Sequence, residues 1–151
     1  MCDLWTWSLA DRPDPAAVRG AVAAATGRAV APLGAAADGD AQDAILCDVW
    51  HTGGEFPTVV DCYLAPTAVS ELAVAASVAV RLGRACLLAD ESLDPTRHLL
   101  VAADGTVRRV HATVTEAPDG PHTSDVRPCT ADDPWCGRGP GRRPAPPAVA
   151  A

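Results

Sequence analysis

The dipeptide Asp104-Gly105 constrains the fold of this chain more than any other short feature of its sequence. It separates two strand patterns, residues 97–103 and residues 106–115. Asp-Gly favours the two-residue turns whose backbone twist matches that of paired antiparallel strands. The sequence therefore predicts a β-hairpin over this region.

A second hairpin is expected around Thr52-Gly53-Gly54-Glu55. The strand pattern before it, residues 44–51, places alternate apolar residues on one face. The pattern after it, residues 56–64, does the same with Phe56, Thr58, Val60, Cys62 and Leu64. Two such runs around a Gly-Gly turn are typical of antiparallel strands.

Two helices are expected between the strands. Asp14 is a good N-cap with Pro15 at the first helical position, and Gly27 suits a left-handed C-cap, which predicts a helix over residues 15–26. The second helix is expected from Pro66-Thr67 to about Leu82, with apolar residues on one face at helical spacing.

Further strand patterns cover residues 3–9, 28–33 and 85–89. The resulting order, β-α-β-β-β-α-β-β-β, predicts an α+β fold in which two helices pack on one face of a mostly antiparallel sheet. We expect one domain over residues 1–116. Residues 117–151 are rich in Pro, Gly and Arg and lose apolar periodicity, so they are expected to form a disordered tail.

The charge of the chain limits its partners. All 12 basic residues are arginine and the net charge is −7, so we expect no nucleic-acid binding, which needs clustered basic residues. The composition suggests a GC-rich genome such as that of an actinobacterium. The N-terminus has no signal-peptide pattern and no apolar run is long enough for a membrane span. We expect a cytoplasmic protein with no membrane partner, and a basic protein is the partner that its acidity would favour.

The six cysteines are expected to be free thiols in a reducing compartment, and those in strand patterns, Cys47, Cys62 and Cys86, to be small buried hydrophobic residues. Cys129 and Cys136 either remain free in the tail or close a small disulfide loop. With four histidines they form no CxxC or HExxH motif. We expect no metal and no cofactor.

Catalysis has little support in the sequence, and we expect no enzyme. One alternative is a small Cys/His enzyme, because Cys62 follows Asp61 and His51 lies across the predicted hairpin. A second alternative is a structural homodimer with Trp5 and Trp7 at its interface. Core packing is favoured for at least one of these two tryptophans.

Charge gathers beside ordered structure in the loop from Asp90 to Pro95. Its ligand spacing does not match an EF-hand. Three carboxylates in this loop, those of Asp90, Glu91 and Asp94, are therefore candidate contacts for a partner protein. Trp50 or Glu55, at the other hairpin, would add to this surface.

The stretches RLGRACLLADE and SLDPTRHLLV and the Asp-Gly hairpin, within residues 69–111, resemble small actinobacterial proteins, some of which are similar to immunity proteins of polymorphic toxin systems. This resemblance implies an intracellular protein that neutralises a toxin by binding it. It assigns no catalytic residues. The interpretation that follows is a non-enzymatic protein-binding module.

Overall fold

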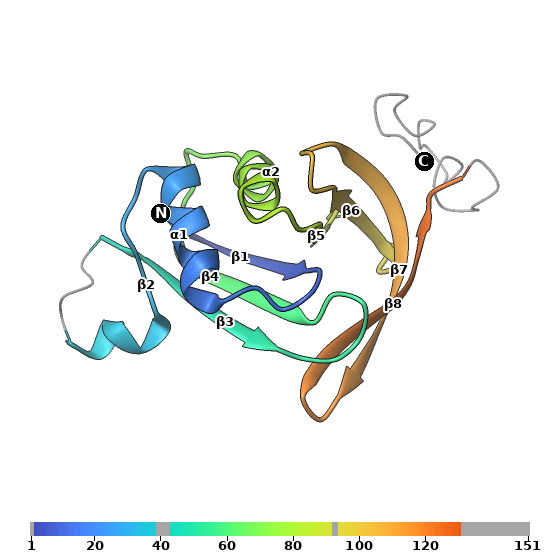
Figure 1. The fold of residues 1–151 in the computed structure, drawn as a ribbon, viewed down its shortest axis with the longest axis horizontal. Helices are drawn as coiled ribbons and strands as arrows, with labels where there is room; N and C mark the ends of the chain where they lie inside the picture. Colours follow the sequence, from blue (N-terminus) through green and yellow to red (C-terminus); the bar gives the residue numbers. More distant parts are fainter. Residues whose placement is uncertain (1, 39–42, 92–93, 131–151) are drawn as a thin grey trace.

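The computed structural model describes residues 2–38, 43–91 and 94–130. Within these ranges the chain forms eight strands, two α-helices and one short 3-10 helix (Figure 1): β1 (Cys2–Leu9), α1 (Pro15–Thr26), β2 (Val30–Ala31), η1 (Leu33–Asp38), β3 (Ile45–His51), β4 (Thr58–Pro66), α2 (Glu71–Leu82), β5 (Cys86–Ala89), β6 (Arg97–Val101), β7 (Val107–Ala117) and β8 (Gly120–Pro128).

The eight described strands form one sheet in the order β2-β3-β4-β1-β5-β6-β7-β8. Every neighbouring pair is antiparallel except β2 and β3, which are parallel. Both expected hairpins form, β3–β4 and β6–β7, and the α+β fold class is confirmed. None of the helices in the described ranges is long and apolar enough to cross a membrane.

The helices begin and end where local chemistry favours it. The Asp14 side chain accepts a hydrogen bond from the Ala16 amide, and Gly27 ends α1 in the left-handed conformation. The second helix starts later than expected, at Glu71, because β4 continues through Pro66. Ser70 is its N-cap and accepts a bond from the Ala73 amide at 3.2 Å.

Both helices cover one face of the sheet, as expected (Figure 1), and the main core lies between them and the strands. Trp5 and Trp7 are 2 % and 1 % exposed in this core, with ring centroids 5.8 Å apart. Core packing is therefore confirmed for both tryptophans. Both side chains are buried within one chain, so they are not part of its surface.

The opposite face carries a smaller apolar cluster of Phe56, Leu87, Val110 and Ala112. The long β7–β8 hairpin bends away from the helices toward the β3–β4 loop (Figure 1). Gly54 bridges to Thr123, and the Glu55 amide donates a hydrogen bond of 2.8 Å to the Thr123 carbonyl. The last strand is thereby joined to a loop about seventy residues earlier in the chain.

The expected domain boundary at residue 116 is too early. β7 runs to Ala117, and residues 120–128, assigned to the tail by sequence, form the edge strand β8. Periodicity missed β8 because it buries little of its own surface, mainly at Thr123. An edge strand also tolerates Pro121 and Pro128, which cannot donate to a ladder. The rest of the expected tail, residues 131–151, lies outside the described residues.

Candidate functional site

One end of the sheet brings together the start of β1 and the end of β4. The two strands are antiparallel, so Asp3 pairs with Ala65. The first turn of α2 lies over β1, because Trp7 Nε1, in the second half of that strand, donates a hydrogen bond of 3.0 Å to Glu71 Oε1, and Glu71 also interacts electrostatically with Asp3. Residues from distant parts of the sequence therefore share this end.

Three carboxylates, those of Asp3, Glu71 and Glu91, gather here, and we call them the acidic end. Burial raises the pKa of Glu71, the hydrogen bond from Trp7 lowers it, and the negative charges of Glu91 and Asp3 raise it further. The net effect is a raised pKa of Glu71, caused mainly by burial and increased by the negative charges of Glu91 and Asp3. Asp3 and Glu91 are exposed to solvent.

Two large apolar side chains are exposed beside Asp3. Leu4 is 56 % exposed and Leu64 is 48 % exposed. Asp3 pairs with Ala65 and Trp5 with Cys62, so two residues of β4, one of them Leu64, face Leu4 across a β-bulge. We call Leu4 and Leu64 the leucine pair.

Leu64 is also strained. Its φ is 62°, a left-handed conformation that costs roughly 1–2 kcal/mol for residues other than glycine. Folding alone gives no reason to hold a leucine in this conformation with half of its surface in water. Strain of this kind is concentrated at functional sites, which makes the leucine pair a candidate contact.

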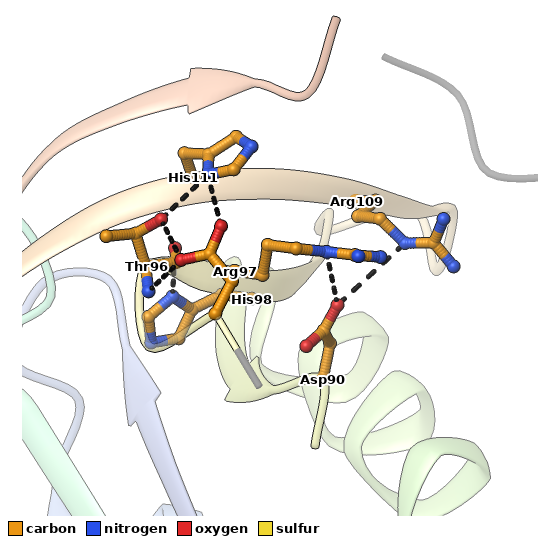
Figure 2. Close-up of polar contacts among 7 residues, drawn as sticks. Asp90, Thr96, Arg97, His98, Arg109 and His111 are labelled. Carbon is orange, nitrogen blue, oxygen red and sulfur yellow. Dashed lines mark hydrogen bonds and ion pairs between the residues drawn. The ribbon is translucent and has the colours of Figure 1, made fainter. Parts of the chain in front are cut away.

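A buried ionic cluster lies next to Glu91, on the face of the sheet that carries the helices (Figure 2). Asp90 follows β5, Arg97 begins β6 and Arg109 is in β7. Asp90 Oδ2 is 2.9 Å from Arg97 Nε and 3.9 Å from Arg109 Nε. The three side chains are only 5 %, 7 % and 16 % exposed. We call these residues the arginine cluster.

A chain of hydrogen bonds fastens the neighbouring loop to β7. Thr96 Oγ1 donates to Asp94 Oδ1 at 2.7 Å, and its lone pairs can then accept from His111 Nδ1 at 2.8 Å. Burial raises the pKa of Asp94, but hydrogen bonds from the Thr96 hydroxyl and amide outweigh it, and the pKa is lowered overall. Figure 2 shows Thr96 pointing toward His111.

The structure separates the three carboxylates that the sequence groups as a contact surface. Asp90 faces two arginines inside the protein, and its side chain is 5 % exposed. The Asp94 side chain is 13 % exposed and is held by Thr96. Glu91 is the exposed member of the group, and it belongs to the acidic end.

Trp50 and Glu55 lie away from the acidic end, since the β3–β4 loop is at the other end of β1, where Thr58 pairs with Leu9. Trp50 is half-buried and donates a hydrogen bond of 3.1 Å to Asp61. A side chain at Gly120 would overlap with the Trp50 ring, so this tryptophan packs against the β7–β8 turn. Glu55 is exposed beside the same hairpin.

The residues of the enzyme alternative do not meet. His51 pairs with Thr58 and hydrogen-bonds to it at 3.1 Å, whereas Cys62 pairs with Cys47. Cys62 is fully buried, and its hydrogen bond to Cys47 and its burial raise its pKa, so it is held as a neutral thiol. Burial also raises the pKa of Cys86.

Cys47, Cys62 and Cys86 are buried free thiols, as expected. Cys129 is also a free thiol at the end of β8, and Cys136 lies outside the described residues, so the question of their pairing stays open. In the described part of the chain, no group of three or more His, Cys, Asp or Glu side chains is placed to hold a metal ion.

Sequence reasoning missed four residues of this region: Asp3, Leu4, Leu64 and Glu71. Alternation placed Leu64 on the buried face with Cys62, but the bulge turns it outward. No local signal marks a bulge without glycine, and the grouping of the carboxylates depends on strand order. Comparison with protein-family models, with curated protein sequences and with solved structures finds no match to this chain.

Proposed function

We propose that this chain is a non-enzymatic protein-binding module whose contact surface consists of the leucine pair and the acidic end. The observation that supports it is the strained and exposed Leu64 opposite the exposed Leu4. Protein interfaces combine an apolar centre with a polar rim, and the largest contributions to affinity come from the centre.

The charge of the acidic end indicates the charge of the proposed partner. Exposed carboxylates at Asp3 and Glu91 lie near the leucine pair, and their mutual repulsion with Glu71 is relieved when a cationic surface approaches. The chain as a whole carries a net charge of −7, which adds long-range attraction for the same partner. We therefore propose a basic protein with an apolar patch.

The resemblance to immunity proteins gives this proposal a specific form. Under this more specific proposal, the partner is a toxin and the complex forms in the cytoplasm of an actinobacterial cell. The chain neutralises the toxin by binding to it. Co-expression with a toxin encoded by a neighbouring gene should restore growth. Growth arrest in spite of soluble immunity protein would rule out this form of the proposal.

The binding proposal is tested by capture from lysates of cells that produce the chain, with matched variants as bait. Leu4→Asp and Glu91→Arg change the proposed surface. Val114→Asp and Glu116→Arg make the same changes on β7, where Val114 is 44 % exposed and Glu116 is exposed. A true partner should be retained by the wild type and both controls and lost from the first two variants.

Capture that is equal for all four variants would reject the proposed surface. The dependence on salt gives a second test, because a basic partner should associate more slowly as ionic strength rises. Glu91→Arg should reduce that dependence, whereas Leu4→Asp should leave it in place and accelerate dissociation.

A further inference from the structure

Cys47 and Cys62 face each other directly across the hairpin of β3 and β4. Along an antiparallel pair of strands, hydrogen-bonded and non-hydrogen-bonded positions alternate. The Thr52 amide donates a hydrogen bond of 2.6 Å to the Pro57 carbonyl, which marks a hydrogen-bonded position. Counted from there in the register of the hairpin, Cys47 and Cys62 occupy a non-hydrogen-bonded position, where facing side chains lie closest.

The two sulfur atoms are already in contact. The Cys62 thiol donates a hydrogen bond to Cys47 Sγ, with 3.8 Å between the sulfur atoms. A disulfide requires Cα atoms about 4.4–6.8 Å apart and a bond of about 2.05 Å between the sulfur atoms. Facing residues at a non-hydrogen-bonded position have Cα atoms about 4.5 Å apart. The backbone is therefore within the range of a disulfide, and rotation of the side chains brings the sulfur atoms together.

The surroundings distinguish the two thiols. The hydrogen bond from Cys62 stabilises the Cys47 thiolate, and the positive charge of Arg19 adds to this effect. Together they lower the pKa of Cys47 in spite of its burial and the nearby carboxylates, whereas the same hydrogen bond and burial raise the pKa of Cys62. The thiolate is the form that attacks an oxidant. Cys47 is therefore the nucleophile, and Cys62 is the thiol that reacts second.

Cys47 lies where β3 becomes an edge of the described sheet. β2 pairs with β3 only at Ile45 and Leu46, and the half-buried Arg19 side chain follows on this edge, where its Nε donates a hydrogen bond of 3.0 Å to the Cys47 carbonyl. Local opening of an edge costs less free energy than opening of the whole sheet. An oxidant as small as hydrogen peroxide can thus reach Cys47, although both cysteines are fully buried in the closed structure.

We propose that Cys47 and Cys62 are a redox pair that hydrogen peroxide converts into a cross-strand disulfide. The Cys47 thiolate attacks one peroxide oxygen, so that an S–O bond forms and the O–O bond breaks. The hydroxide that leaves takes up the proton released by Cys47 and becomes water. The Cys62 sulfur then attacks the Cys47 sulfur, the S–S bond forms, the S–O bond breaks, and the departing hydroxide leaves with the Cys62 proton as a second water. The two sulfur atoms lose two electrons, which the peroxide gains.

The test is peptide mapping of the folded, full-length chain after exposure to hydrogen peroxide. The chain is then unfolded, its remaining thiols are alkylated, and it is cleaved after arginine and glutamate. Cys47 and Cys62 are then the single cysteines of two separate peptides, residues 29–55 and 56–71. We expect these peptides to be joined, with a mass two hydrogens below their sum, and both cysteines to escape alkylation. Cys86 is equally buried, in β5, and should still be alkylated.

Matched variants separate the two roles. In Cys62→Ser, oxidation of Cys47 should stop at the sulfenic acid, which dimedone traps. In Cys47→Ser, Cys62 should remain reduced for as long as Cys86 does. Dimedone labelling of Cys62 in Cys47→Ser would contradict the assignment of Cys47 as the nucleophile.

Two results with the wild-type chain would overturn the redox pair. In the first, Cys47 and Cys62 are alkylated to the same extent as Cys86 after exposure to peroxide. In the second, Cys47 and Cys62 join other cysteines as often as each other, which indicates that disulfides form in unfolded chains. Both results come from the wild-type chain, so they do not depend on the folding of a variant.

Discussion

At position 64 the usual order of alanine and glycine in a strand should be reversed. At an ordinary strand position, a protein with glycine is less stable than the same protein with alanine by about 0.5–1 kcal/mol, because glycine loses more conformational freedom on folding. At a φ of 62° alanine carries a left-handed penalty that glycine avoids. Leu64→Gly should therefore be more stable to chemical denaturation than Leu64→Ala, by about 1 kcal/mol.

Val114 provides the comparison for this pair, since it is an exposed strand residue with an ordinary backbone. Val114→Ala should be more stable than Val114→Gly. If Leu64→Ala is also more stable than Leu64→Gly, the backbone at Leu64 is not strained. The binding surface then loses the support that this strain gives it.

Glu71 shows how the acidic end affects stability. Its pKa is raised above 4.5 in the folded protein, so the folded state binds this proton more tightly than the unfolded chain does. Its contribution is therefore unfavourable at neutral pH, and the penalty disappears as the pH falls toward 4.5. Glu71→Gln keeps an oxygen acceptor for Trp7 but removes the negative charge, and with it the cost of burying that charge and its repulsion by Glu91 and Asp3.

We expect Glu71→Gln to raise the free energy of unfolding near neutral pH by less than about 1 kcal/mol, because the site is partly screened by water. The gain should shrink as the pH falls toward 4.5. Glu116→Gln, at an exposed position on β7, should show no such change. A gain that is constant over this pH range would mean that the charge of Glu71 is not its cause.

Among the elements, the hairpins follow from local chemistry and the edge strand does not. Asp104 accepts hydrogen bonds from the Thr106 amide and hydroxyl, and Gly105 has a φ of 89°, so this turn could be predicted from its own residues. β8 depends instead on pairing with β7 and on contact with the β3–β4 loop. The residues of β8 alone show no pattern from which its pairing with β7 or its contact with the β3–β4 loop could be predicted.

The contact between β8 and the β3–β4 loop depends on Gly54. Its φ is 86°, and a Cβ there would lie 2.7 Å from the Thr123 carbonyl oxygen. Gly54→Ala should therefore destabilise the protein by about 1–3 kcal/mol and release β8 from the loop. Hydrogen exchange at the Glu55 amide, which bonds to Thr123, would report the release.

Gly34→Ala is the matched control, because Gly34 has an ordinary φ and no atom lies within 4 Å of a Cβ added there. It should leave the exchange of the Glu55 amide unchanged. Normal protection of that amide in Gly54→Ala would show that β8 is held by its pairing with β7 alone.

For the molecule as a whole, sequence patterns predict the layers but not the site. Apolar periodicity and capping residues locate both helices and the buried tryptophans, because these signals lie within short segments. The arginine cluster and the acidic end are made by residues from separate elements, such as Asp90 with Arg109 and Asp3 with Glu71. Strand order and one β-bulge determine which of these residues lie together, and no short segment of the sequence encodes either feature.

The proposed binding surface is tested most directly by site-specific photocrosslinking in cells that produce the chain. A photoreactive amino acid is placed at position 4 and, as a control, at position 114. Val114 pairs with Thr123 beside the β3–β4 loop, at the other end of β1 from Leu4. We predict one discrete crosslinked partner from position 4 and none from position 114. Crosslinks that are the same from both positions, or no crosslink from position 4, would contradict the account.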